Sequence, residues 1–235
     1  MVKMKAKDYR ARARGDLAAI PKKTYLLMGL VMVLATALTH ATDKMSTQNS
    51  RDWWISFILS VIASFLTSNG QIFFNRWRMA IHEGSEEPDA WCGLSSQHLW
   101  KLLIYGMIEA GLLAILLILA LGSLLVNSSS VFMWLLAVAV TVVIVWVELR
   151  LSFVVYEIDE DIRLNRQTSV WSEILDSWQL MKGRCWKLFC LNLSFIGWYI
   201  LVFFTLGILG MWLQPYKSLA NAEFYAEAKA GQEEQ

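Results

Sequence analysis

Four polar side chains lie within or at the ends of long apolar runs of this sequence: Glu109, Asn192, Glu148 and Arg150. Glu109 lies deepest, about two helical turns inside its run, where a carboxylate costs about 2.5–3.5 kcal/mol on membrane-insertion scales. Such a group either binds a proton or a cation, or is tolerated near the interface through a hydrogen bond, for example to Tyr105. Asn192 is expected to bond between helices. Glu148 and Arg150 are expected to form an interfacial ion pair.

The patterns of several enzyme classes are missing from the sequence. There is no His-Glu-x-x-His zinc motif, no glycine-rich phosphate loop followed by lysine, and no Gly-x-Ser-x-Gly. The acidic pair Glu86-Glu87 follows His82, but it lies in a proline-containing segment with no second histidine in an apolar run. Cys92, Cys185 and Cys190 have no metal or disulfide spacing and are expected to be small hydrophobic residues. We therefore expect no enzyme activity, no cofactor and no metal.

The composition points to a lipid environment for these side chains. Of the 235 residues, 56% are apolar and 17% are charged, whereas a soluble domain carries about 25% charged residues. The net charge of +1 gives no reason to expect nucleic acid as a partner. Apolar runs of about 18 or more residues predict helices that cross a bilayer.

The apolar runs predict an all-α membrane protein, a polytopic bundle of about six transmembrane helices with a basic N-terminal helix and a cytoplasmic amphipathic helix. A basic cytoplasmic segment at 1–24 precedes a single transmembrane domain at 25–230 and a polar tail at 231–235. The predicted spans cover residues 25–40, 53–74, 102–126, 131–150, 186–206 and 208–227. A basic start followed by a short apolar run is also typical of a signal peptide, which stays an alternative for the first span.

Two segments have further polar patterning. Within the second span, hydroxylated or small side chains recur at Ser60, Ser64, Thr67, Ser68 and Gly70. They allow helices to pack closely or line a polar path, and we expect packing. Near Val170–Met181, apolar residues recur at helical spacing, which predicts an amphipathic helix on the inner surface or under the bundle.

The distribution of basic residues predicts the orientation. With six spans, 19 of the 21 Lys and Arg residues lie on one side, and the other side has only Lys44 and Arg51. Cytoplasmic loops collect Lys and Arg, so both termini are expected in the cytoplasm of a multi-pass plasma-membrane protein.

The C-terminal third contains a recognisable series of motifs. These are Met181-Lys-Gly183, Leu193-Ser-Phe-Ile-Gly-Trp198, Thr205-Leu-Gly-Ile208, Pro215-Tyr216 and Phe224-Tyr225. The series resembles the bacterial integral membrane family catalogued as domain of unknown function nine-seven-five, common in Firmicutes. The resemblance implies a six-helix membrane protein and no catalytic residue. Structural roles are expected for Gly183, Ser194, Gly197, Trp198, Gly207, Pro215 and Tyr216.

Three functions stay open from these observations. The first is a non-enzymatic scaffold or accessory protein that binds lipid or a membrane-protein partner, or forms a homo-oligomer. The second is a small transporter or permease-like unit that uses Glu109, since interrupted helices such as the last two often mark binding sites. The third is self-immunity or protection against envelope stress, which rests on analogy alone. The sequence favours the first.

Overall fold

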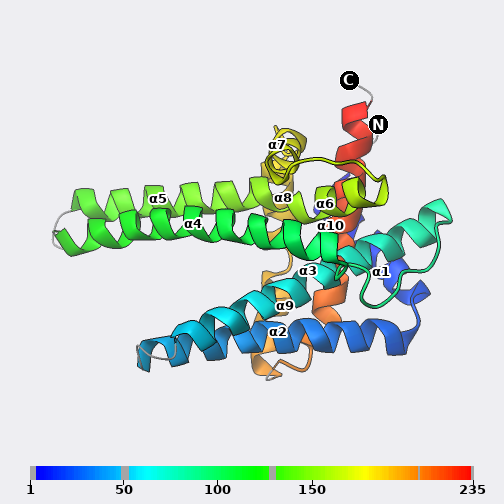
Figure 1. Cartoon of the computed structure of the whole chain (residues 1–235), viewed down its shortest axis with the longest axis horizontal. Coiled ribbons are helices and arrows are strands. Elements are labelled where there is room, and N and C mark those ends of the chain that lie inside the picture. Colours follow the sequence, from blue (N-terminus) through cyan, green and yellow to red (C-terminus); the bar gives the residue numbers. More distant parts are fainter. Residues whose placement is uncertain (1–3, 49–52, 127–130, 206, 234–235) are drawn as a thin grey trace.

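The structure is a computed structural model that describes residues 4–48, 53–126, 131–205 and 207–233. Its described residues form helices and turns and contain no strand (Figure 1). The helices are α1 (Ala6–Ala19), α2 (Lys22–Gln48), α3 (Trp53–Glu83), α4 (Ser96–Val126), α5 (Val131–Leu151), α6 (Val154–Arg163), α7 (Val170–Leu180), α8 (Cys185–Leu193), α9 (Ile196–Phe204) and α10 (Gly210–Glu233). The predicted all-helical class is confirmed.

Two long antiparallel pairs dominate the molecule. Helices α2 and α3 form one pair and α4 and α5 form the other, and both pairs extend toward the left in Figure 1. The two chain ends lie at the opposite end of the molecule, where α10 packs against α1, α2 and α3. The tyrosine hydroxyl of Tyr216 donates to the carbonyl of Arg10 at 3.1 Å, which joins α10 to α1.

Helix α1 is basic but its apolar face is covered by protein. Lys5 caps it, with its backbone N–H donating to the Asp8 carboxylate at 2.8 Å. Tyr9, Ala13 and Leu17 are buried. The sequence predicted a helix in this segment, and the structure confirms it.

Three helical segments among the described residues are long and apolar enough to cross a membrane: Ile55–Glu83, Val138–Arg163 and Cys185–Phe204. The pair Ala6–Ala19 and Lys22–Leu38, which bends by 117° around Pro21, makes a fourth if it crosses as one unit. The protein thus has several helices suited to a membrane.

The helices differ from the predicted spans at several positions. Within the span at 186–206 the chain turns at Ser194–Phe195, which separates α8 from α9, although Cys185–Phe204 as a whole is long and apolar enough to cross a membrane. The Ser194 hydroxyl donates to the Leu191 carbonyl at 2.6 Å, as expected of a side chain that bonds to its own helix. Helix α4 begins at Ser96, before the predicted 102, and α2 continues past 40 to Gln48.

Helices α2 and α10 meet backbone to backbone at Gly29. A Cβ atom on Gly29 would lie 2.0 Å from the Met211 carbonyl oxygen and 3.0 Å from Cγ of Pro215. Pro215 has no N–H to donate to the carbonyl four residues earlier, so the Met211 oxygen has lost its partner within the helix. Glycine is therefore needed at position 29 for the two helices to approach at this point.

Candidate functional site

A polar cavity of about 460 Å³ lies between α3, α4, α5, α6, α8 and α10. Its volume falls within the range of about 300–1,000 Å³ that is usual for small-molecule sites. Polar groups make up most of its wall: Ser60, Ser64, Thr67, Ser68, Gln71, Tyr105, Glu109, Glu148, Ser152, Tyr156, Asn192, Lys217 and Asn221. Ala63, Leu102, Leu151 and Val155 complete the wall.

Helix α3 contributes one polar face to the cavity. Ser60, Ser64, Thr67 and Ser68 follow the i, i+4, i+7, i+8 spacing of a helix face, and all four line the cavity. Gly70 lies away from it, where an added Cβ would come within 2.6 Å of the Met32 sulfur. The four hydroxylated residues thus lie on the polar side of the alternative left open by the sequence, whereas Gly70 packs against α2. We call the four residues the α3 hydroxyl face.

Two carboxylates line the same cavity. Glu109 comes from α4 and Glu148 from α5, and the two are close enough to repel each other. The Tyr105 hydroxyl lies near Glu109 and donates to the Leu151 carbonyl at 3.4 Å. Since α4 and α5 are antiparallel neighbours, two carboxylates that are distant in sequence lie in one wall.

Three oxygen atoms of the cavity residues have no hydrogen-bond partner. They are the amide oxygens of Asn192 and Asn221 and the hydroxyl of Tyr156. Tyr156 is only 1% exposed. An unsatisfied buried polar atom costs about 1–3 kcal/mol, so these three atoms are a costly feature of the residues around the cavity.

Lys217 of α10 also lines the cavity. Its ammonium donates to the Tyr199 hydroxyl at 3.1 Å and lies 5.4 Å from the centre of that ring. A cation over an aromatic ring is attracted by the electron-rich face. Lys217 is therefore already engaged by a neighbour on α9.

Three of the four residues selected from the sequence thus meet in one place, and the fourth does not. Glu109, Glu148 and Asn192 line the cavity. Arg150 lies against the adjoining rings of Trp146 and Trp178, 4.8 and 4.9 Å from their centres. Its guanidinium also donates to the Trp178 carbonyl at 2.8 Å. Glu148 and Arg150 therefore do not form the expected ion pair. Arg150 contacts the two tryptophans, and Glu148 lines the cavity.

The residues of the C-terminal motifs have structural contacts. Gly183 and Gly207 adopt φ angles of +75° and +89°, which favour glycine. Trp198, Trp212 and Tyr216 form a row of rings with centres 5.2 and 4.9 Å apart. A Cβ on Gly197 would meet no atom within 4 Å, so close helix contact does not explain this residue.

A buried ion-pair cluster joins α3, α4 and α6. The carboxylate of Asp159, 1% exposed, accepts hydrogen bonds from Nη2 of Arg76 at 2.6 Å and from Nε of Arg76 at 3.0 Å. Nε2 of His98 lies 3.1 Å from the same carboxylate, and Nδ1 of His98 lies 2.6 Å from the Ser95 hydroxyl. Asp159 thus has partners on two other helices.

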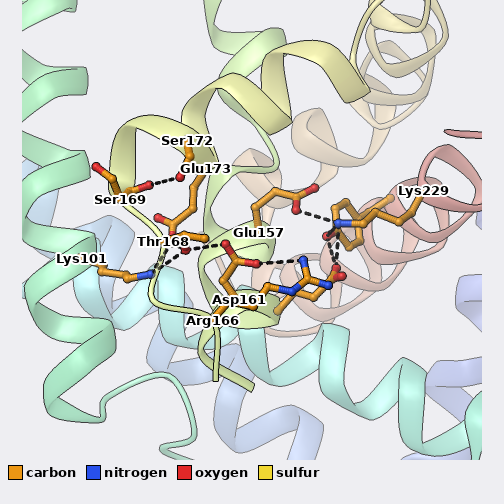
Figure 2. A network of polar contacts seen from close by, with 11 residues as sticks. Lys101, Glu157, Asp161, Arg166, Thr168, Ser169, Ser172, Glu173 and Lys229 are labelled. Atoms are coloured by element: carbon orange, nitrogen blue, oxygen red, sulfur yellow. Dashed lines mark hydrogen bonds and ion pairs between the residues drawn. The ribbon is translucent and has the colours of Figure 1, made fainter. Parts of the chain in front are cut away.

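Figure 2 shows a second polar network around α6 and α7. The ammonium of Lys101 pairs with Glu173 and donates to the Thr168 hydroxyl at 3.3 Å, and Thr168 donates to Asp161 at 2.6 Å. Burial raises the pKa of the Glu173 carboxyl, and the hydrogen bond and charge of Lys101 oppose that rise. These contacts fix α7 against the N-terminal end of α4.

The C-terminal helix α10 is joined to α6 by a further set of contacts. Lys229 of α10 pairs with Glu157 at 2.8 Å and with Glu160 at 3.1 Å, and Figure 2 shows the first of these pairs beside α6. The Tyr225 hydroxyl donates to Glu160 at 2.7 Å. Together they hold α10 against α6.

One group of side chains has the composition of a metal site. Asp16, His82 and Glu223 place their ligand atoms within 4.8 Å of one another. However, Arg78 lies 3.0 Å from the Glu223 carboxylate and Arg12 lies 3.5 Å from it. The two arginines already balance the negative charge of Glu223, as a metal ion would. These contacts are therefore those of an ion-pair cluster.

Comparisons with known proteins give a family but no activity. A family model described as "Protein of unknown function (DUF975)" matches residues 3–232. Searches of curated proteins and of solved structures found no match.

Proposed function

We propose a function from the premise that this chain belongs to the DUF975 family of proteins of unknown function. The protein is a small transporter or permease-like unit that takes a polar solute into the cavity between α3, α4, α5, α6, α8 and α10. It performs no catalytic step and needs no cofactor. This departs from the scaffold role that the sequence favoured, because the polar side chains lie in one cavity.

A single observation carries the proposal: polar groups from six helices surround one space beside helices that are apolar enough to cross a membrane. Polar groups in a bilayer are costly and usually mark a solute or ion pathway. Packing alone would bring hydroxyls and amides into contact with each other. Here the amide oxygens of Asn192 and Asn221 have no partner.

The broken helices support the same function. Asn192 lies directly before the turn that separates α8 from α9, and α1 and α2 are separated by Pro21. Transporters often bind their solutes near an interrupted membrane helix. The turn at Ser194 follows Asn192 of the cavity by two residues, and the backbone N–H groups of Ser194 and Phe195 keep partners within the segment.

The proposed topology has six spans in a bacterial cytoplasmic membrane, with both termini in the cytoplasm. It is supported by the distribution of the basic residues, of which this arrangement leaves only Lys44 and Arg51 outside. Helix α7 lies at the inner surface in this arrangement. Its Trp171 and Leu175 side chains are exposed, which suits contact with lipid.

Osmotic swelling of proteoliposomes tests the function. Vesicles with the purified protein are shrunk in hyperosmotic urea, glycine, ethanolamine hydrochloride or sodium acetate, and reswelling is followed by light scattering. We expect faster reswelling than in protein-free vesicles for at least one solute. Thr67→Trp on the α3 hydroxyl face should abolish the difference, because indole fills the cavity. Ile58→Trp, at an apolar residue that is 56% exposed on the same helix, should not.

A second function, the scaffold or accessory role, is supported by aromatic residues on the surface of α8 and α9. Trp186, Phe203 and Phe204 are 72%, 78% and 77% exposed. They offer an apolar surface to lipid or to a membrane-protein partner. Vesicles that reswell at the protein-free rate in all four solutes would favour this role over transport.

A further inference from the structure

We infer that the solute of this cavity carries a protonated amine. The inference rests on the proposed solute-binding function and adds the chemical class of the solute. Three properties of the cavity support it: the sign of its charges, the type of its unpaired atoms and the shape of its wall.

The charges of the cavity favour a cation. Glu109 and Glu148 lie in one wall and repel each other. Of the described residues that line the cavity, Lys217 is the only one with a positive side chain, and it is bound to Tyr199. A positive group between the two carboxylates would relieve their repulsion, and a carboxylate or phosphate would add to it.

The unpaired atoms of the residues around the cavity are hydrogen-bond acceptors, which favour a solute that carries donors. Asn192 and Asn221 each leave an amide oxygen without a partner, and an amide oxygen can only accept. Tyr156 adds a buried hydroxyl that can accept as well as donate. An ammonium group has three N–H donors and no acceptor, so it satisfies carboxylate and amide oxygens together. A quaternary ammonium, which has no N–H, would not.

The size and wall of the cavity favour an organic amine over a bare ion. The volume of about 460 Å³ is that of a small-molecule site. Leu102, Leu151 and Val155 form an apolar part of the wall beside the polar groups. A short alkyl chain can contact these residues while the ammonium contacts the oxygens.

Binding of matched four-carbon probes tests the inference. The full-length protein in a non-ionic detergent is titrated at pH 7 with n-butylammonium chloride, 1-butanol or sodium butyrate. The melting midpoint is followed by the fluorescence of its 12 tryptophans, and affinity is measured by calorimetry. We expect saturable stabilisation by n-butylammonium alone. Tetramethylammonium chloride, which lacks N–H donors, should bind at least about tenfold more weakly.

Substitutions locate the bound probe. The double variant Glu109→Gln, Glu148→Gln should bind n-butylammonium at least about tenfold more weakly. The control Glu86→Gln, Glu87→Gln changes two exposed carboxylates of a loop and should bind like the unmodified protein. If the double variant does not fold, the Asn221→Leu variant is measured in its place. Asn221→Leu is also expected to bind n-butylammonium more weakly than the unmodified protein.

Three outcomes would overturn the inference. They are saturable binding of butyrate or butanol in preference to the amine, undiminished amine binding by the carboxylate and Asn221 variants, and no binding of any probe. The swelling assay distinguishes this failure from failure of the proposed function. If acetate or urea enters through the cavity while amines do not bind, solute transport stands and only the amine is wrong.

Discussion

Gly29→Ala is expected to lower the free energy of unfolding by about 3 kcal/mol, at the upper end of the usual range for overpacking. The added methyl carbon would lie 2.0 Å from the Met211 carbonyl oxygen, which is a backbone atom that cannot rotate away. Helices α2 and α10 would have to separate, and α10 also packs against α1 and α3. Thermal denaturation of the detergent-solubilised protein, with size-exclusion chromatography of the heated sample, measures the loss.

Gly106→Ala is the matched control for this substitution. A Cβ on Gly106 in α4 would meet no atom within 4 Å. Alanine is favoured over glycine inside a helix by about 1 kcal/mol, so this variant should be as stable as the parent or more stable. Equal melting midpoints for Gly29→Ala and Gly106→Ala would show that α2 and α10 do not make the contact described.

Asp159→Ala is expected to cost about 3–5 kcal/mol, because it leaves the charge of Arg76 without its buried partner. It also removes the oxygen near Nε2 of His98. The exposed Asp176 of α7 provides the control, since Asp176→Ala should change stability by less than about 0.5 kcal/mol. Chemical denaturation in mixed micelles gives both values.

A double variant separates the ion pair from a simple cavity effect. Arg76→Met combined with Asp159→Leu removes both charges and keeps side-chain volume, so it should be more stable than Asp159→Ala. If the double variant loses as much stability as the sum of its single changes, Arg76 and Asp159 do not interact as a pair.

The sequence predicted the helices well because apolar length is a strong local signal. The last two predicted spans were separated at Gly207, and its φ of +89° explains why glycine stands there. The break between α8 and α9 was missed, since Ser194 and Phe195 lie in a continuous apolar run with no proline or glycine at the turn. The break depends on tertiary contacts, including burial of Phe195.

Some of the residues that line the cavity were selected from the sequence. Glu109, Glu148 and Asn192 were visible because a polar residue in an apolar run is costly and therefore conspicuous. Lys217 and Asn221 were missed, since α10 is polar along much of its length and two more polar residues do not stand out.

Other features of the site depend on how the helices pack. The spacing of the α3 hydroxyl face was visible, but spacing alone cannot separate helix packing from a polar wall. Tyr156 was missed because a tyrosine near a core is common, and only the structure leaves its hydroxyl unpaired. The partners of Arg150 required the position of Trp178 on another helix.

The central claim is that the α3 hydroxyl face lines a water-filled cavity in a membrane protein, and cysteine accessibility tests it most directly. Cys92, Cys185 and Cys190 are replaced by serine, and either Ser64→Cys or Ile62→Cys is added. The two positions are about 3 Å apart along the helix axis but on opposite faces. Ser64 lines the cavity, whereas Ile62 is an apolar residue that is 45% exposed.

Membrane vesicles of both orientations are treated with a cationic, water-soluble thiosulfonate. The account predicts that the cysteine at position 64 reacts rapidly from at least one side and that the cysteine at 62 does not. Equal lack of reaction at both positions from both sides, in protein that labels fully after denaturation, would contradict a water-filled cavity at this face.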